Sequence, residues 1–321
     1  MQSPFPYSDC NKRYHTLDYH LRHKFSSKVF KVSLNAGFTC PNRDGTKGIG
    51  GCTYCSAQGS GDFAGDPADS LIEQFEKIRD LQLKKWPDAL YIPYFQAFTN
   101  TYASVAELKK RFEPMLKPER VVGLNVATRA DCLPDEVVEY LADLNQRTYL
   151  TVDLGLQTIH DKTAERINRC HSYQEFLEGF QKLQAKGIST CVHIINGLPG
   201  ETPEMMLETA KAVADLHPQS VKIHLLHVLK GTRLAEEFLA GEFEALTLPE
   251  YVQIVCDQLE WFPPETVIQR ITGDGAKESL IAPRWSLKKC VVMNEIDKEL
   301  ARRDSYQGIA RSDSDATEKQ K

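Results

Sequence analysis

The sequence lacks any long apolar run. Its 321 residues contain no stretch close to the roughly 18 consecutive apolar residues of a membrane-spanning helix. The first twenty residues, MQSPFPYSDCNKRYHTLDYH, lack the apolar centre of a secretory signal peptide. These two absences argue against a membrane protein and against a secreted one, so we expect a cytoplasmic protein.

A large excess of one charge is also lacking. The 39 Lys and Arg stand against 44 Asp and Glu, and the formal net charge of -5 argues against non-specific nucleic-acid binding by the whole surface. Segment 11–31 differs, because it holds six Lys or Arg, one acid, three histidines and four aromatic residues. Basic side chains can hold phosphates while aromatic rings stack on unpaired bases. The segment is either a nucleic-acid contact or a solvated arm whose rings pack on the protein.

Cysteine is unevenly placed along the chain. The nine cysteines are an odd number with scattered spacing, which does not indicate a disulfide framework. Cys40, Cys52 and Cys55 nevertheless fall together in CPNRDGTKGIGGCTYC. Thiolates bind zinc or iron–sulfur clusters, but a structural zinc takes four protein ligands and no second ligand pair lies nearby. A [4Fe–4S] cluster held by three cysteines leaves one iron open for a further ligand. The triplet favours such a cluster, with zinc and unligated cysteines as the alternatives.

Short apolar runs alternate with amphipathic stretches along the chain. We predict strands at 28–35, 90–95, 121–127, 148–156, 189–196 and 220–228, and helices at 69–86, 104–116, 133–145, 173–187 and 202–217. This alternation indicates an α/β fold with parallel strands. Six such units fit a partial (β/α)6 barrel of the TIM type better than an open sheet. The site is then expected at the carboxyl ends of the strands.

We divide the sequence into four regions. They are a basic-aromatic arm at 1–27, a barrel at 28–240, a C-terminal extension on the substrate side at 241–305, and a disordered tail at 306–321. The tail is predicted from RSDSDATEKQK, which is polar and charged and offers no apolar face to bury.

The cysteine triplet resembles the cluster motif of the radical S-adenosylmethionine (radical SAM) superfamily. That motif is CxxxCxxC with an aromatic residue before the last cysteine, a place that Tyr54 holds here. The first gap is eleven residues instead of three, as in the branch that contains the catalytic subunit of Elongator and in a bacterial family that the chain resembles from about residue 10 to residue 300. The resemblance implies a [4Fe–4S] cluster on Cys40, Cys52 and Cys55, S-adenosylmethionine (SAM), and an external one-electron donor of the flavodoxin or ferredoxin type.

Two downstream segments carry the same resemblance. DLGLQTIHDKTAERINRCH is similar to a fourth-strand motif shared with oxygen-independent coproporphyrinogen oxidases, and it implies that Gln157 reaches the ribose and Arg169 the carboxylate of SAM. VHIINGLPGE is similar to a fifth-strand segment whose backbone lies against adenine, which points to Asn196 and Gly197. His193 departs from that pattern, because relatives often carry Asp at this position.

Further candidates stand at other strand ends and beyond the barrel. Cofactor contacts are expected from Gln96, Asn100, Thr101, Thr128 and Arg129. For Arg129 a structural ion pair is the alternative. The residues that resemble the substrate side of the bacterial family are His224, His227, Lys230, Arg270, Asp274, Arg284 and Trp285. For Trp285 core packing is the alternative.

The resemblance implies a radical SAM enzyme that forms a 5′-deoxyadenosyl radical. Similarity to the Elongator branch implies tRNA as substrate, and we predict remodelling of a wobble-uridine C5 side chain from carboxymethylaminomethyl to aminomethyl. A small-molecule substrate, as in the porphyrin branch, is one alternative. A zinc-bearing, RNA-binding scaffold protein is the other.

Overall fold

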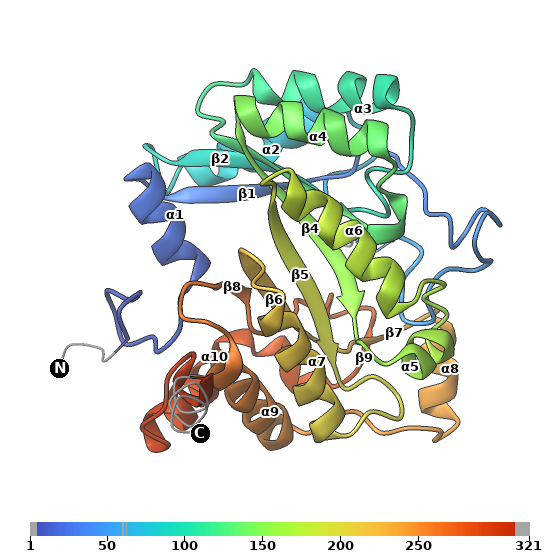
Figure 1. The fold of residues 1–321 in the computed structure, drawn as a ribbon, viewed down its shortest axis with the longest axis vertical. Helices are drawn as coiled ribbons and strands as arrows, with labels where there is room; N and C mark the ends of the chain where they lie inside the picture. Colours follow the sequence, from blue (N-terminus) through green and yellow to red (C-terminus); the bar gives the residue numbers. More distant parts are fainter. Residues whose placement is uncertain (1–4, 60, 62, 312–321) are drawn as a thin grey trace. The chain divides into compact units, whose positions relative to one another are not determined.

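The computed structural model describes residues 5–59, 61 and 63–311 (Figure 1). Its strands form a seven-stranded sheet in the order β1-β2-β3-β4-β5-β6-β8 and a two-stranded sheet of β7 and β9. The pairs β1–β2, β2–β3, β3–β4 and β6–β8 are all parallel. The predicted fold class, an α/β fold in which parallel strands alternate with helices, is confirmed.

The chain divides into two compact units, which we describe separately. The cysteine-loop unit consists of residues 21–156 and 168–191, and the C-terminal unit of residues 1–20, 157–167 and 192–321. The division follows chain contacts and passes through β5, so it does not coincide with the four regions expected from the sequence. The expected boundaries after residues 27 and 240 stay predictions.

The cysteine-loop unit is built on its strands and the helices that follow them. In chain order the elements are α1 (Leu17–Phe25), β1 (Val29–Leu34), α2 (Leu71–Leu83), β2 (Leu90–Phe95), α3 (Val105–Phe112), η1 (Glu113–Leu116), β3 (Gly123–Thr128), η2 (Ala130–Cys132), α4 (Asp135–Arg147), β4 (Tyr149–Gln157) and α6 (Tyr173–Ala185). The residues of α1 and β4 are divided between the two units. Figure 1 shows α3 and α4 side by side, and the two helices are in contact.

Local sequence explains where these elements begin and how they pack. Ser70 and Ser172 each start a helix through a reciprocal capping box with the glutamate three residues later. β3 and β4 are buried along most of their length, as expected for strands covered on both faces. The rings of Phe95 and Phe112, with centroids 4.6 Å apart, fill the core beneath α3.

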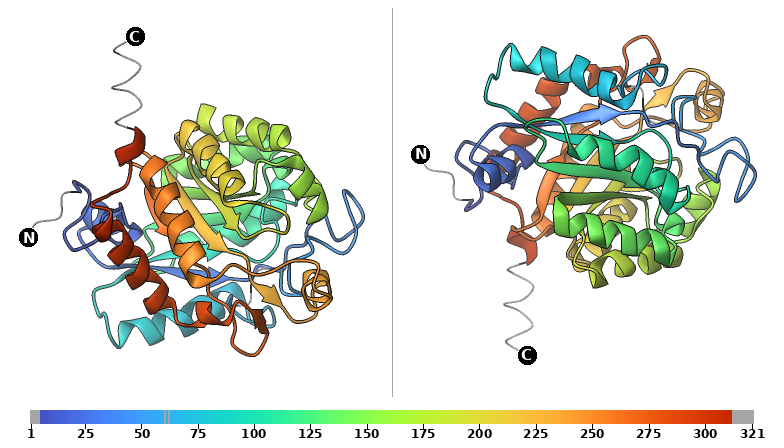
Figure 2. Two further views of the ribbon diagram at one scale, coloured as in Figure 1. Left: turned by 90° about the horizontal axis from the view of Figure 1, so that it is seen from below. Right: turned by 90° about the horizontal axis from the view of Figure 1, so that it is seen from above.

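The C-terminal unit holds the remaining elements. They are α5 (Asp161–Arg166), β5 (Ser189–Asn196, divided between the units), α7 (Pro203–Asp215), β6 (Ser220–Leu225), β7 (Val228–Leu229), α8 (Arg233–Leu239), α9 (Leu248–Trp261), β8 (Val267–Arg270), β9 (Leu280–Ala282), η3 (Arg284–Leu287) and α10 (Lys289–Arg302). In Figure 2 the orange α9 lies beside the red α10, and α9 contacts both α10 and α7.

Two sequence predictions need correction in this unit. The expected strand 220–228 ends at Leu225, because the chain turns there and β7 pairs antiparallel with β9. The region expected as a mere extension also supplies β8, which pairs in parallel with β6. The extension therefore adds a seventh strand to the six that the sequence indicates.

The predicted disordered tail also starts too early. Gln307 is fully buried, accepts a hydrogen bond from the backbone N–H of His15 at 2.8 Å and donates to the carbonyl of Thr266 at 2.8 Å. The chain is thus packed beyond residue 306, and residues 312–321 lie outside the described part. None of the described helices is both long enough and apolar enough to cross a membrane.

Candidate functional site

The loop that carries Cys40, Cys52 and Cys55 follows β1 and has a defined backbone fold. The N–H of Arg43 donates to the carbonyl of Cys40 at 2.8 Å, and the N–H of Cys55 donates to that of Cys52 at 2.9 Å. Gly51 has φ +81°, and a Cβ there would lie 2.9 Å from Arg43 Nε, so glycine is needed. None of the three cysteines is in a disulfide, and all three are partly exposed, as metal-binding thiols on a surface loop would be.

The three thiols fit a cluster of several metals better than one zinc ion. Sulfur atoms on one tetrahedral zinc lie about 4 Å apart, because each Zn–S bond is about 2.3 Å. In the described part of the chain, no ligand set with donor atoms within 4.8 Å of one another contains these three cysteines. The wider spacing, with no fourth cysteine on the loop, is the donor set expected for an iron–sulfur cluster with an open iron.

The long gap between Cys40 and Cys52 is docked on the segment after α5. Asn168, in the left-handed region at φ +53°, donates from Nδ2 to the carbonyl of Gly51 at 2.8 Å. Asn42 donates in the opposite direction, to the carbonyl of Asn168, and its Nδ2 also lies 3.6 Å from Cys52 Sγ. These bonds hold the peptide next to Cys52 in place.

Arg169 lies in the same segment and is 5% exposed. Its Nη2 donates to the carbonyl of Gly155 at 2.5 Å, while its buried Nε has no hydrogen-bond partner among the described residues. Tyr54 lies near Arg169 and Cys52. Burial and the neighbouring Cys52 raise the pKa of its hydroxyl, and the positive charge of Arg169 opposes that rise. A buried, unused guanidinium donor beside the cysteine loop fits the carboxylate of a bound ligand.

Arg129 makes the structural ion pair that the sequence left as an alternative. Its Nε and Nη2 donate to the two carboxylate oxygens of Asp131 at 2.8 and 2.9 Å, and both side chains are 3% exposed. Its Nη1 donates to the carbonyl of Arg169 at 2.9 Å. Burial raises the pKa of Asp131, but the bonds and charge of Arg129 outweigh it and lower the pKa overall. Arg129 therefore positions the segment that carries Arg169.

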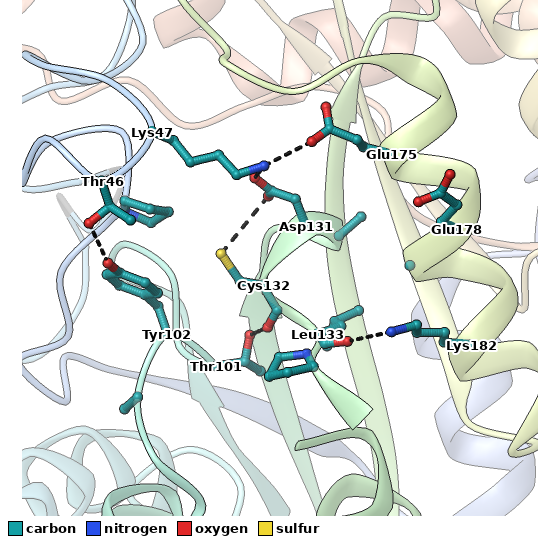
Figure 3. A pocket seen from close by; sticks show the side chains of 15 residues that line it. Thr46, Lys47, Thr101, Tyr102, Asp131, Cys132, Leu133, Glu175, Glu178 and Lys182 are labelled. Carbon is teal, nitrogen blue, oxygen red and sulfur yellow. Dashed lines mark hydrogen bonds and ion pairs between the residues drawn. The ribbon is translucent and has the colours of Figure 1, made fainter. Parts of the chain in front are cut away.

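A pocket of about 700 Å³ opens beside this ion pair (Figure 3). Lys47, from the cysteine loop, extends across it and binds both Asp131 at 3.1 Å and Glu175 of α6 at 2.8 Å. Pro41, Thr101, Tyr102, Cys132 and Lys182 are among the other residues that line it. The three cluster cysteines do not line it. The pocket thus borders the loop without including its three thiols. Lys47, Asp131 and Glu175 are paired with one another, whereas Lys182 pairs with Asp135 outside the lining.

The other candidates at the second and third strand ends differ in what they leave unused. Asn100 is buried, and its Nδ2 donates to the carbonyl of Ala127 at 2.9 Å while its Oδ1 has no partner among the described residues. The hydroxyls of Thr101 and Thr128 lie 2.5 Å apart and bond to each other. Gln96 is half-buried after β2. Asn100 offers a buried acceptor that suits an ammonium group, whereas the two threonines are occupied in structure.

Three of the residues predicted to contact the cofactor lie in the C-terminal unit. Asn196 forms a reciprocal amide pair with Gln258 of α9, with both distances 2.8 Å, so its side chain is turned towards structure. Gly197 has φ +88°, which favours glycine, but a Cβ there would lie 3.2 Å from Leu246 Cδ1, so a side chain of the protein itself packs close to this backbone. Gln157 ends β4 at φ +78°, a strained conformation for a residue with a side chain and one found mostly at functional positions.

The basic-aromatic segment packs many of its rings on the protein. Tyr14 is 3% exposed. The ring of Phe25 lies edge-on to Tyr149 at 5.5 Å, and the Nζ of Lys24 lies 4.9 Å from the centroid of Tyr149. These rings follow the packed alternative, so any nucleic-acid contact by this segment rests on its cations.

Sequence reasoning missed four residues that shape the site: Lys47, Asp131, Asn168 and His171. His171 is 7% exposed, and burial with the charges of Arg169 and Arg129 lowers its pKa to about 3. Asp131 lies three residues after the end of β3, close enough to the strand end to have been a usable signal. Asn168 and Lys47 act only through partners far away in the sequence, so no local pattern marks them.

Family models match most of the chain. The model of the Radical SAM superfamily matches residues 39–213, which is more than half of the sequence, and that of the Radical SAM C-terminal domain matches residues 218–302. The Bacillus subtilis (strain 168) relative named uncharacterized protein YtqA is 58% identical over 306 residues, which cover 95% of each chain.

More distant similarities point to one branch. The tRNA uridine(34) acetyltransferase of Methanocaldococcus jannaschii is 28% identical over 158 residues, 48% of this chain and 29% of the relative. The solved structure of Methanocaldococcus infernus Elp3 with an N-terminal deletion matches with a TM-score of 0.66 at 20% identity, over 88% of this chain and 64% of that chain. This second similarity shows a shared fold.

Proposed function

Since this chain belongs to the radical SAM superfamily, we propose that it is the member that remodels the C5 side chain of a wobble uridine in tRNA, from carboxymethylaminomethyl to aminomethyl. The protein is a radical SAM enzyme, and the cofactors of its family are a [4Fe–4S] cluster and SAM. The observation that supports this chemistry most directly is the three-thiol loop beside the unused Nε of Arg169.

The chain's own groups have defined tasks in this reaction. Cys40, Cys52 and Cys55 would hold the cluster, and Arg169 would receive the carboxylate of SAM through its buried Nε. When bound, the cluster and SAM would supply the one-electron chemistry that takes a hydrogen atom and one further electron from the carboxymethyl group, and hydrolysis of the resulting imine would release that two-carbon unit as glyoxylate and leave the aminomethyl group. Asn100 Oδ1 would accept a hydrogen bond from the ammonium group. Asn168 and Arg129 keep these parts in register.

Two similarities support tRNA as the substrate. A relative that covers nearly half of this chain is named tRNA uridine(34) acetyltransferase, and the fold is shared with an archaeal Elp3. Each of these matches covers only part of the relative, 29% of the acetyltransferase and 64% of the Elp3 chain, so the tRNA activity is a proposal for this protein. A small-molecule substrate has no comparable support from the described residues.

The test uses anaerobic, cluster-loaded enzyme with SAM, a reductant, and tRNA that carries carboxymethylaminomethyluridine. Nucleoside mass spectrometry follows the wobble position. Wild type should produce aminomethyluridine, and Cys52→Ala should not. Unchanged tRNA under conditions in which the enzyme cleaves SAM would contradict the tRNA proposal while leaving radical SAM chemistry in place.

A further inference from the structure

A second group of titratable side chains lies in the C-terminal unit, at the carboxyl ends of β6 and β8. His224 is the fifth residue of β6, and Arg270 ends β8 in register with Lys222. The ring of His193, on β5, lies 5.1 Å from that of His224. His227 lies two residues after the end of β6. The carboxyl end of a parallel strand is where this type of fold places its reactive and binding groups.

Two of these histidines have unused buried atoms. The Nε2 atoms of His224 and His227 are inaccessible to solvent and have no hydrogen-bond partner among the described residues. Buried polar atoms are nearly always paired in folded proteins, so two such atoms three residues apart call for an explanation. Burial lowers the pKa of both imidazoles, with Arg270 also disfavouring their charged form. Both rings are therefore neutral at physiological pH, and each can donate from Nε2 in one tautomer.

The chain is shaped around His227. A Cβ on Gly273 would lie 3.0 Å from Cε1 of His227, and one on Gly275 would lie 3.4 Å from the same atom. The first distance is tighter than a usual contact and the second is an ordinary one, so a side chain at Gly273 would require the loop after β8 or this ring to shift slightly. Packing fixes the ring in place, although no described residue bonds to its Nε2.

Positive charge exceeds negative charge around these histidines. The carboxylate of Asp274 accepts hydrogen bonds from Arg270 Nη2 at 2.9 Å and from Lys289 Nζ at 2.8 Å, so one negative group faces two cations. Arg270 retains partial exposure, with its side chain 35% accessible. The local field therefore favours an anion.

We propose that His224, His227 and Arg270, here called the histidine–arginine cluster, bind the carboxylate of the substrate's side chain. This inference rests on the proposed function, in which that side chain carries a carboxymethyl group before reaction and an aminomethyl group afterwards. Imidazole N–H groups and a guanidinium are suitable donors to a carboxylate. The product ends in an amine, whose positive charge the same cluster disfavours. The cluster thus discriminates substrate from product at one end of the modified side chain.

The test compares two synthetic anticodon stem-loop RNAs that differ only in carrying carboxymethylaminomethyluridine or aminomethyluridine at the wobble position. Binding to the cluster-loaded enzyme is measured without reductant, so that no turnover occurs. Wild type should bind the carboxylate-bearing RNA about tenfold more tightly, the effect of one charged hydrogen bond. Arg270→Gln and His227→Gln should abolish that preference without weakening binding of the aminomethyl RNA.

Arg233→Gln is the matched control, because Arg233 likewise pairs with an acid four residues later, Glu237. It should keep the full preference. Arg270→Lys, which keeps the positive charge, should retain part of the preference for the carboxylate-bearing RNA. Iron content and melting temperature show whether each variant is folded and carries its cluster. Equal affinity of wild type for both RNAs, or a preference that survives in Arg270→Gln and His227→Gln, would overturn the inference.

Conversion is measured separately after reductant is added. An enzyme that converts the RNA without preferring its carboxylate overturns the cluster alone. An enzyme that neither converts nor binds either RNA overturns the proposed function, and this inference with it.

Discussion

Lys47, in the middle of the loop between the first two cluster cysteines, places its Nζ 3.1 Å from Oδ2 of Asp131. Asp131 is in turn held by both arms of the buried Arg129, which also binds the carbonyl of Arg169. The cysteine loop is therefore tied to the segment expected to hold SAM through a chain of charges. The wide Cys40–Cys52 gap is docked on the protein.

The first prediction concerns the buried end of this chain. Asp131→Asn removes the partner of a guanidinium that is 3% exposed and should lower the free energy of unfolding by about 3–5 kcal/mol. Asp135→Asn is the control, because Asp135 pairs with Lys182 at 2.7 Å but is 86% exposed, so water screens the pair and its loss should leave the free energy of unfolding nearly unchanged. Urea unfolding measures both. Similar losses in the two variants would contradict the anchoring role of Asp131.

The second prediction concerns the tie between Asn168 and the cysteine loop. Asn168→Gly keeps the left-handed backbone but removes the amide that binds Gly51 and Ile49. Cys52 should then be held less firmly. Iron should pass to a chelator about tenfold faster, because lost hydrogen bonding of about 1.4 kcal/mol lowers the barrier to release by that amount. Asn145→Gly removes an exposed amide contact to Gly187 in the same unit and should leave the rate unchanged. Equal rates in all three proteins would show that the tie does not hold the cluster.

The third prediction concerns pH. The pKa of His171 is lowered to about 3 in the folded protein, against about 6.5 in the unfolded chain. Between these values the unfolded chain binds a proton that the folded protein does not, so stability from this group is complete above about pH 6.5 and falls as pH drops. The slope is about 1.4 kcal/mol per pH unit.

His171→Gln cannot titrate and should lack that slope. Urea unfolding at about pH 7, 6 and 5 should therefore show wild type losing stability faster than the variant as the pH falls. Parallel pH profiles for the two proteins would contradict the buried, neutral state of this imidazole.

Much of the fold could be predicted from local pattern. The apolar runs at 90–95 and 189–196 became β2 and β5, because buried parallel strands need continuous apolar residues. β8 could not be found this way. Its four residues, VIQR, end in two polar side chains, and their pairing with β6 depends on a partner more than forty residues away.

The site shows the same limit. The cysteine triplet was visible because its three cysteines lie on one loop, and their number and spacing favoured a cluster over zinc. The role of Arg129 was not visible, because a guanidinium at a strand end suits either a ligand or an ion pair. Only the position of Asp131 decides between them. Unused atoms such as Arg169 Nε can be identified only when all neighbouring partners are known.

The most direct measurement is SAM cleavage by anaerobic, iron-loaded and reduced enzyme, followed as 5′-deoxyadenosine with the tRNA substrate present. Wild type and Cys290→Ser, which alters an exposed cysteine outside the loop, should both form the product. Cys40→Ala, Cys52→Ala and Cys55→Ala should not. Product formation by any of these three variants, or none by a fully loaded and reduced wild type, would contradict the assignment of the loop as the cluster site.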